Sequence, residues 1–339
     1  MPVLNDIDRY VDIMYEIIKT HSYIPRIPKE KDIHDHSSNK DRTIGVQPYF
    51  PDGLMQQLVV EVMKNVLMRG MHRWCCASIP DRGGHDMLRR SKKLIQRQQK
   101  SSRYIAELDV KQFYPSTPQA GVIRALERKI KDKTFLRLIA VIISCNQLGL
   151  AGVEELDLTP EEIVGDRVGM HIGFYINQWL ENYYLETADR AALSQRGVKV
   201  ELRYMDNINI SGSNKRQLHR AVRAISAHLR TLGLRLKENW QLYKVDARPL
   251  STVGYRIGRD FVILRKRNFL RLARQCRRVL KKIKQHKPIP FKQAQSLLSR
   301  VGQLCHCNNY RIFQKYIKPI GLKRLKNIVR AESLRARCA

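Results

Sequence analysis

Two aspartates are placed where they could do chemistry together. Asp109 lies near the end of the apolar run YIAELDV, and Asp206 lies in the turn between the apolar runs VKVELRYM and INISG. A single aspartate at such a turn is usually only a turn former. Two acids at neighbouring strand ends form a site for divalent cations, because Mg²⁺ prefers carboxylate, water and phosphate oxygens. Paired metals of this kind activate a hydroxyl and hold a triphosphate in nucleotidyl transfer. We therefore expect Asp109 and Asp206 to meet in one sheet and to bind Mg²⁺ or Mn²⁺.

The elements that position these acids follow from hydrophobic periodicity and from turn residues. The first half of the chain predicts an amphipathic helix over 4–20, a linker or loop over 21–41, a helix over 53–69, a glycine turn over 78–85 that opens a basic helix, a strand over 104–110 and helical structure over 119–147. The second half predicts a helix over 177–190, the strand pair around Asp206, a basic helix over 214–233, and further strands whose last pair turns at 258–260. From Asn268 onward the pattern predicts basic helices, the first two separated by Pro288 and Pro290.

The composition indicates a folded chain with a polyanionic partner. The 339 residues are 43% hydrophobic, and 63 Lys and Arg oppose 31 Asp and Glu, a formal charge of +32. Nucleic acid is the partner that such an excess favours, although charge alone does not separate a binding protein from an enzyme. Cys305-His306-Cys307 is too tight for the usual zinc spacing, and no second ligand pair is evident. Since no apolar run is long enough to cross a bilayer, we expect no membrane association and a cytoplasmic protein.

The two aspartate segments resemble motifs A and C of reverse transcriptases, whose patterns are D-x-x-x-F-[FY] and Y-x-D-D. Here they read DVKQFY and YMDN. Other segments resemble further motifs of that family, in the family's order: DRTIGVQPYFPDGLMQQ in the fingers, the turn SIPDRGGH, GMHIGFYINQWLENYYLETAD as motif B, LGLRLKENWQ as motif D and STVGYRIGRDFVILRK as motif E. The resemblance covers about residues 40 to 265. It implies an α+β, right-hand polymerase fold, with fingers, an antiparallel palm sheet and a helical thumb. The expected divisions are an N-terminal helix and linker at 1–40, fingers and palm at 41–265, and a basic helical thumb at 266–339.

The resemblance implies a metal site and a proton donor. Asp109 and Asp206, with Asn207 and Val110, correspond to the metal-binding positions. Lys237 matches the motif D lysine that protonates the pyrophosphate leaving group. The alternative for Lys237 is one solvated lysine among many.

The resemblance also implies a set of substrate-binding residues. Tyr114, next to Phe113, corresponds to the aromatic gate that rejects a ribose 2′-hydroxyl, and the alternative is an ordinary core aromatic. Ile172 and Gly173 correspond to positions beneath the templating base pair, where an apolar residue loses a polar contact and should lower base discrimination. The remaining substrate-binding candidates are Gln178 in motif B and Arg42, which could pair with the triphosphate.

Within the family, the chain is most similar to bacterial and phage enzymes of diversity-generating retroelements. Motif B there reads hydrophobic-Gly-x-x-x-Ser-Gln, and here Asn177 replaces the serine in Ile172-Gly173-x-x-x-Asn177-Gln178. Such enzymes are compact, lack endonuclease and ribonuclease domains, and work with a basic accessory protein. The short stretch 21–41 departs from that branch, so defence-type and unassigned bacterial enzymes remain open.

Asn207 is the main departure, because the family has a second aspartate there. Losing that carboxylate should weaken metal binding or slow catalysis. Three readings remain open: an active enzyme with an altered site, a natural loss of activity, and an engineered knockout. The resemblance implies an RNA-directed DNA polymerase that uses Mg²⁺ or Mn²⁺, dNTPs, an RNA template and a DNA or RNA primer. A catalytically impaired RNA-binding scaffold is the alternative, and Tyr114 disfavours an RNA polymerase.

Overall fold

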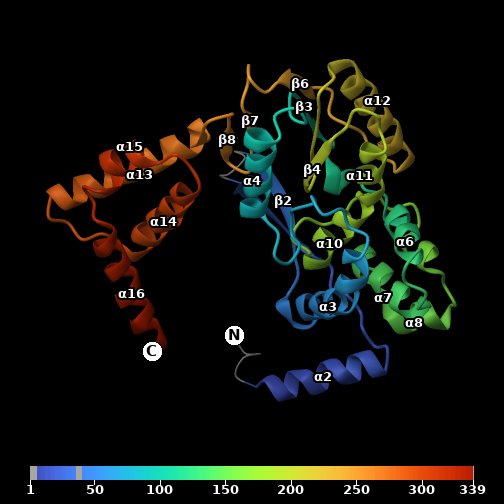
Figure 1. The fold of residues 1–339 in the computed structure, drawn as a ribbon. Coiled ribbons are helices and arrows are strands. Elements are labelled where there is room, and N and C mark those ends of the chain that lie inside the picture. The colour runs from blue at the N-terminus through green and yellow to red at the C-terminus, as the bar shows by residue number, and fades with distance from the viewer. Residues whose placement is uncertain (1–5, 36–39, 339) are drawn as a thin grey trace. The chain divides into compact units, whose positions relative to one another are not determined.

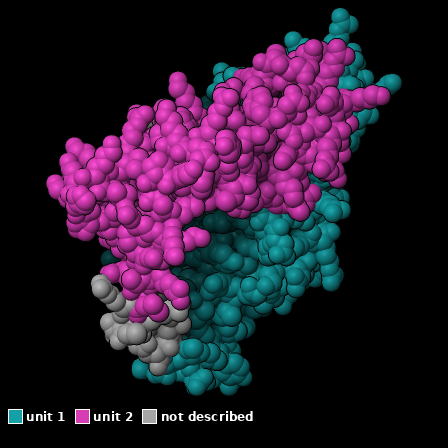
Figure 2. Space-filling model, turned by 60° about the vertical axis from the view of Figure 1, so that its left-hand side comes forward, with its two compact units in different colours: residues 1–83, 106–242 teal, residues 84–105, 243–339 magenta. Residues whose placement is uncertain are grey.

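The computed structural model describes residues 6–35 and 40–338, and the chain forms two compact units. One unit contains residues 1–83 and 106–242, and the other contains residues 84–105 and 243–339 (Figure 2). Both units are thus built from separate stretches of sequence. None of the helices in the described residues has the length and apolar character needed to cross a bilayer.

The first unit begins with helix α2 (Ile7–Lys19), as predicted over 4–20, although residues 4 and 5 lie outside the described residues. The prediction of a loop over 21–41 was wrong in part. Strands β1 (Lys29–Asp35) and β2 (Lys40–Val46) form an antiparallel pair with Lys29 opposite Val46. Their sequences, KEKDIHD and KDRTIGV, lack the regular apolar alternation that predicts a half-buried strand. The two strands pair through their backbones.

A four-stranded sheet, most of which belongs to this unit, has the strand order β4-β5-β3-β6. Its strands are β3 (Tyr104–Asp109), β4 (Val200–Tyr204), β5 (Asn207–Gly212) and β6 (Gln241–Lys244). β4 and β5 are antiparallel, and the pair Tyr204 and Asn207 closes a two-residue turn. The strands around Asp206 were therefore predicted correctly, and β5 lies directly beside β3.

Helices surround this sheet (Figure 1). After the π-helical turn η1 (Tyr49–Gly53) they are α3 (Leu54–Met68), α5 (Phe113–Ser116), α6 (Gln119–Glu127), α7 (Lys133–Ser144), α8 (Gly149–Glu155), α9 (Pro160–Val164), α10 (Tyr175–Tyr184), α11 (Glu186–Leu193) and α12 (Lys215–Thr231). Within the unit, α11 packs against β4, and α12 packs against β5. The helical stretch predicted over 119–147 is divided in two. The second helix, α7, begins after Asp132, which caps it by accepting a hydrogen bond from the Phe135 amide at 2.9 Å.

The second unit combines a small sheet with helices. Its sheet has the order β7-β8-β9, with β7 (Leu250–Thr252), β8 (Tyr255–Ile257) and β9 (Val262–Leu264). Ile257 pairs with Val262, which confirms the hairpin predicted at 258–260. The helical segments are α4 (Gly84–Lys92), η2 (Lys93–Arg97), α13 (Lys266–Lys284), α14 (Phe291–Gly302), η3 (Gln303–His306), α15 (Tyr310–Ile312), η4 (Phe313–Ile317) and α16 (Leu322–Cys338). One apolar cluster, which includes Leu272, Cys276 and Leu297, joins α13 and α14 to the sheet.

Candidate active site

Asp109 and Asp206 lie beside each other across two adjacent strands. The amide of Val110, the residue after Asp109, donates to the carbonyl of Asp206 at 3.1 Å. The carbonyl of Asp109 accepts from the amide of Lys237 at 2.8 Å. These backbone bonds bring three distant segments of the chain, around residues 109, 206 and 237, to one edge of the sheet.

The two carboxylates interact electrostatically. Burial raises the pKa of Asp206 above its usual range, and the negative charge of Asp109 raises that pKa further. The positive charges of Lys237 and Arg42 act in the opposite direction, lowering the pKa of Asp206. A divalent cation would stabilise the ionised form of a partly buried carboxylate that lies near a second negative charge.

Two polar side chains contact the pair of acids. The Lys237 ammonium forms an ion pair with Asp109 Oδ1. Asn207 Nδ2 donates to Asp206 Oδ1 at 3.1 Å. An aspartate at position 207 could not donate this bond and would add a third negative charge. Asn207 therefore stabilises the Asp206 carboxylate.

The backbone is strained next to both acids. Met205, immediately before Asp206, has φ of 53°, and Gln112, three residues after Asp109, has φ of 46°. Non-glycine residues adopt this left-handed region at a cost of about 1–2 kcal/mol. Such strained residues persist where surrounding structure fixes them, and they concentrate at functional sites.

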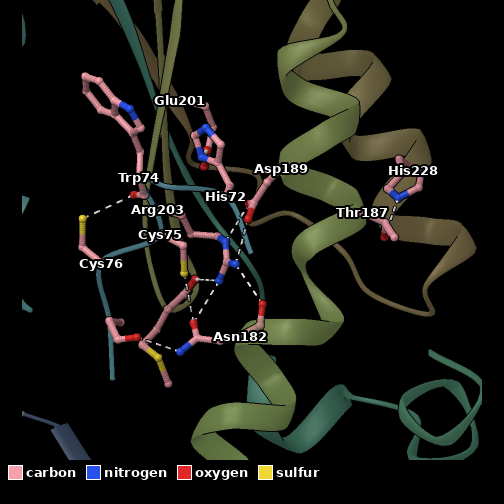
Figure 3. A network of polar contacts seen from close by, with 12 residues as sticks. His72, Trp74, Cys75, Cys76, Asn182, Thr187, Asp189, Glu201, Arg203 and His228 are labelled. Carbon is pink, nitrogen blue, oxygen red and sulfur yellow. Dashed lines mark hydrogen bonds and ion pairs between the residues drawn. The ribbon is translucent and has the colours of Figure 1, made fainter. Parts of the chain in front are cut away.

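A buried polar network centred on Arg203 of β4 contacts the Met205–Asp206 turn. Figure 3 shows Arg203 with Asp189 and Asn182. Arg203 is fully buried, and its Nε and Nη2 donate to the two oxygens of Asp189 at 2.6 and 2.8 Å. The same guanidinium donates to Asn182 Oδ1 at 3.1 Å and to the Met205 carbonyl at 3.4 Å. Burial lowers the pKa of Arg203, but the charge and hydrogen bond of Asp189, together with the charges of Cys75 and Glu201, raise it more, so the guanidinium stays protonated. Sequence reasoning missed this network, since its members are far apart in the chain.

Tyr114 and Phe113 lie on the short helix α5. Phe113 is buried, and its ring packs edge-on against the Tyr114 ring at 5.8 Å. Burial raises the pKa of Tyr114; the charges of Glu181 and Asp206 raise it further, and Arg42 lowers it. The Tyr114 hydroxyl is therefore in electrostatic reach of the carboxylate site, and Phe113 supports its ring.

Glu181 on α10 is a site residue that sequence reasoning did not identify. Its side chain is fully buried, and Thr117 Oγ1 donates to Glu181 Oε2 at 3.0 Å. Glu181 Oε1 has no hydrogen-bond partner among the described residues. Burial raises the pKa of Glu181 well above its usual value; the Thr117 hydrogen bond lowers it, and the charge of Asp206 raises it. The sequence carried no signal for this role, because the burial of Glu181 arises only when α10 packs.

Ile172 and Gly173 lie against strand β2. The carbonyl of Ile172 accepts from the amide of Gly45 at 2.8 Å. Gly173 has φ of 111°, and a Cβ there would approach the Gly45 carbonyl to 2.7 Å, so only glycine fits. Asn177 Nδ2 donates to the His171 carbonyl at 2.9 Å and holds the preceding loop. The side chain of Gln178 makes no hydrogen bond to another described residue.

The donor set fits a divalent metal held with few protein ligands. Mg²⁺ is commonly bound through one or two carboxylates plus substrate phosphates and water. Asp109 and Asp206 provide that pair, while the described residues contain no group of three His, Cys, Asp or Glu side chains able to hold a metal. The same result gives no support to zinc at Cys305, His306 and Cys307.

A family model described as "Reverse transcriptase (RNA-dependent DNA polymerase)" matches residues 27–256, more than half of the chain. The chain belongs to the reverse transcriptase family. The mixed helices and antiparallel strands of this reverse transcriptase chain form the α+β, right-hand polymerase fold. No curated protein matches it in sequence.

Solved telomerase structures resemble this reverse transcriptase chain. The apo telomerase of Candida tropicalis aligns with a TM-score of 0.50 and 14% identity, covering 90% of this chain and 56% of that protein. A telomerase of Candida albicans bound to a fragment of telomeric RNA gives a TM-score of 0.49 and 11% identity, covering 89% of this chain and 56% of that one. The chain thus spans little more than half the length of these structures. At this identity the first likeness supports the fold alone.

Proposed function

We propose that the chain is an RNA-directed DNA polymerase, which extends a primer on an RNA template by nucleotidyl transfer. The observation that carries the proposal is the pairing of Asp109 and Asp206 at adjacent ends of β3 and the β4–β5 turn. Two acids brought together from segments nearly a hundred residues apart match the site that this chemistry requires.

In this proposal, Mg²⁺ or Mn²⁺ would be held by Asp109 and Asp206, with the Val110 carbonyl and the Asn207 amide oxygen as further ligands. When bound, the metals would lower the pKa of the primer 3′-hydroxyl and neutralise the triphosphate. Lys237 Nζ, which contacts Asp109, would supply a proton to the leaving pyrophosphate.

The other site residues would select and orient substrate. Tyr114, packed on Phe113, would exclude a ribose 2′-hydroxyl, and Arg42 would pair with the triphosphate. Ile172 and Gly173 would support the templating base pair, and Gln178 would lie next to them. Because Ile172 offers no polar side-chain group, we expect error-prone synthesis.

The subclass that fits best is the bacterial or phage diversity-generating retroelement type, with a basic accessory protein as partner. The motif B frame Ile172-Gly173-x-x-x-Asn177-Gln178 supports it. A defence-type enzyme is the alternative within the family.

A catalytically impaired RNA-binding scaffold is a second candidate, and Asn207 is the observation that favours it. Its amide is bonded to Asp206, where a second carboxylate would otherwise help to bind metal. The net charge of +32 suits either function.

Primer extension separates the two candidates. The purified chain is incubated with a primed RNA template, labelled dNTPs and Mg²⁺ or Mn²⁺. We expect extension, and a loss of more than about a hundredfold for Asp109→Ala, because one of two metal-binding charges is removed. Asp166→Ala removes an exposed aspartate of the same unit and should leave extension unchanged. Tight RNA binding without extension by the unmodified chain would instead establish the scaffold.

A further inference from the structure

A pocket with charged residues in its lining lies in the first unit, formed by helices α6, α10 and α11 and the end of α12. Its volume is about 390 Å³, within the range of ligand sites. None of the metal-binding or substrate-binding candidates lines it. Helix α6 packs on α10, and α11 packs on both α10 and α12. These packed helices set the walls of the pocket.

Positive charge dominates the lining. Arg124, Arg128, Lys129 and Arg190 line the pocket, against one acid, Glu186. With four cations and one anion, the lining residues carry a formal net charge of +3.

Two of the cations are compensated within the protein. Arg190 Nε donates to Glu186 Oε1 at 2.7 Å, and Arg124 Nη1 donates to Glu161 Oε2 at 3.1 Å. Lys129 has no carboxylate partner of this kind in the described residues; its ammonium donates to the Val66 carbonyl at 3.5 Å and lies 5.0 Å from the centre of the Tyr183 ring. Arg128 makes no ion pair within residues 6–35 and 40–338. The pocket therefore presents a guanidinium and an ammonium whose charge is not neutralised by an acid.

The two tyrosines of the lining form part of the pocket wall, and their hydroxyls are bonded within the protein. The groups that could bind a ligand are therefore the cations. The hydroxyls of Tyr183 and Tyr184 donate to the carbonyls of Ala125 and Leu232 at 3.1 and 2.7 Å. Both rings are buried, so neither is free to stack on a base. Thr187 Oγ1, at 3.0 Å from His228 Nε2, adds one hydroxyl to the lining. A planar guanidinium beside an ammonium and a hydroxyl matches the oxygens of a phosphate.

We propose that the pocket around Arg124, Arg128 and Lys129 binds phosphate groups, as an anion site separate from the Asp109–Asp206 pair. The phosphates would come from a free nucleotide or from the backbone of a nucleic-acid strand. A volume several times that of a single phosphate allows two or more successive phosphates. The site needs no metal, because its charge comes from side chains.

Tripolyphosphate, used as the probe without divalent metal, tests the site on the full chain. Calorimetric titration should show binding that Arg128→Ala weakens by about tenfold, or ~1.4 kcal/mol. Arg128→Lys should recover part of the affinity, because it keeps the charge and loses the planar fork. Arg216→Ala is the matched control, since Arg216 is an exposed arginine on α12 that does not line the pocket. Thermal melting confirms that each variant is folded.

A fluorescent single-stranded RNA identifies the source of the phosphate. If a strand is bound, Arg128→Ala should weaken RNA binding and reduce the slope of log affinity against log salt by about one. If only tripolyphosphate binding falls, the ligand is a free nucleotide or polyphosphate. The proposal is overturned if Arg128→Ala binds both probes as Arg216→Ala does.

Discussion

At the scale of single residues, the site is defined by carboxyl groups whose protonation depends on their surroundings. Glu181 is the clearest case, because burial raises its pKa well above 4.5. In the unfolded chain this carboxyl loses its proton near the ordinary value, while the folded chain retains it. Between these two pKa values the folded state binds the extra proton. Stability therefore falls as pH rises through this window, by up to about 1.4 kcal/mol per pH unit.

Glu181→Gln should remove this pH dependence. The amide oxygen can still accept from Thr117, and nothing remains to ionise. We expect the variant to be more stable than the unmodified chain at pH 8, with the two converging toward pH 5. Urea denaturation at four pH values measures the difference. Equal pH profiles for the two proteins would show that Glu181 is ionised in the folded state.

Asn207 gives the second prediction at this scale. Asn207→Asp removes the hydrogen bond to Asp206 and adds a charge, so it should raise the pKa of Asp206 further when no metal is present. With metal, we expect extension to increase about tenfold, because a third carboxylate shares the cation. Extension rates across a Mg²⁺ titration measure the effect. An unchanged rate and an unchanged metal optimum would count against position 207 as a ligand.

At the scale of elements, the β4–β5 turn depends on what lies behind it. Met205 has a left-handed backbone, and Arg203, two residues earlier, connects the turn to Asp189 and Asn182. Arg203→Lys keeps a buried charge but cannot reproduce the forked contacts. We expect a loss of about 3 kcal/mol in the free energy of unfolding.

The matched control is Arg124→Lys, in an exposed pair with Glu161 that should cost less than about 1 kcal/mol. Urea denaturation measures the free energy of unfolding of Arg203→Lys and of Arg124→Lys. Primer extension at a temperature where Arg203→Lys is folded then reports whether the turn is displaced. Equal stability of the two variants would contradict the role given to Arg203.

Elements with strong local signals could be predicted from the sequence. The β4–β5 pair has alternating apolar runs around a turn, and the resemblance to motif C marked that turn as functional. The β1–β2 pair was missed because its strands are charged and exposed. Arg203 and Glu181 could not be identified, since their burial and partners arise only when α10, α11 and β4 pack together.

At the scale of the whole molecule, the family and fold could be predicted from collinear motifs, while the packing of the basic helices could not. On α13, Leu270 is exposed, whereas Leu272, Cys276 and Val279 are buried. Because α13 has many Lys and Arg residues and few apolar ones, its sequence does not show which apolar side chains face the core. The subdomain boundaries 1–40, 41–265 and 266–339 stay a prediction beside the two compact units.

The central claim is that Asp109 and Asp206 act as one divalent-metal site. Titration of the whole chain with Mn²⁺, followed by the electron paramagnetic resonance signal of the free ion, tests it without requiring turnover. The account predicts that Asp109→Asn and Asp206→Asn each weaken Mn²⁺ binding by more than about tenfold, or ~1.4 kcal/mol, while Asp166→Asn leaves it unchanged. Unaltered Mn²⁺ affinity in both site variants would contradict it.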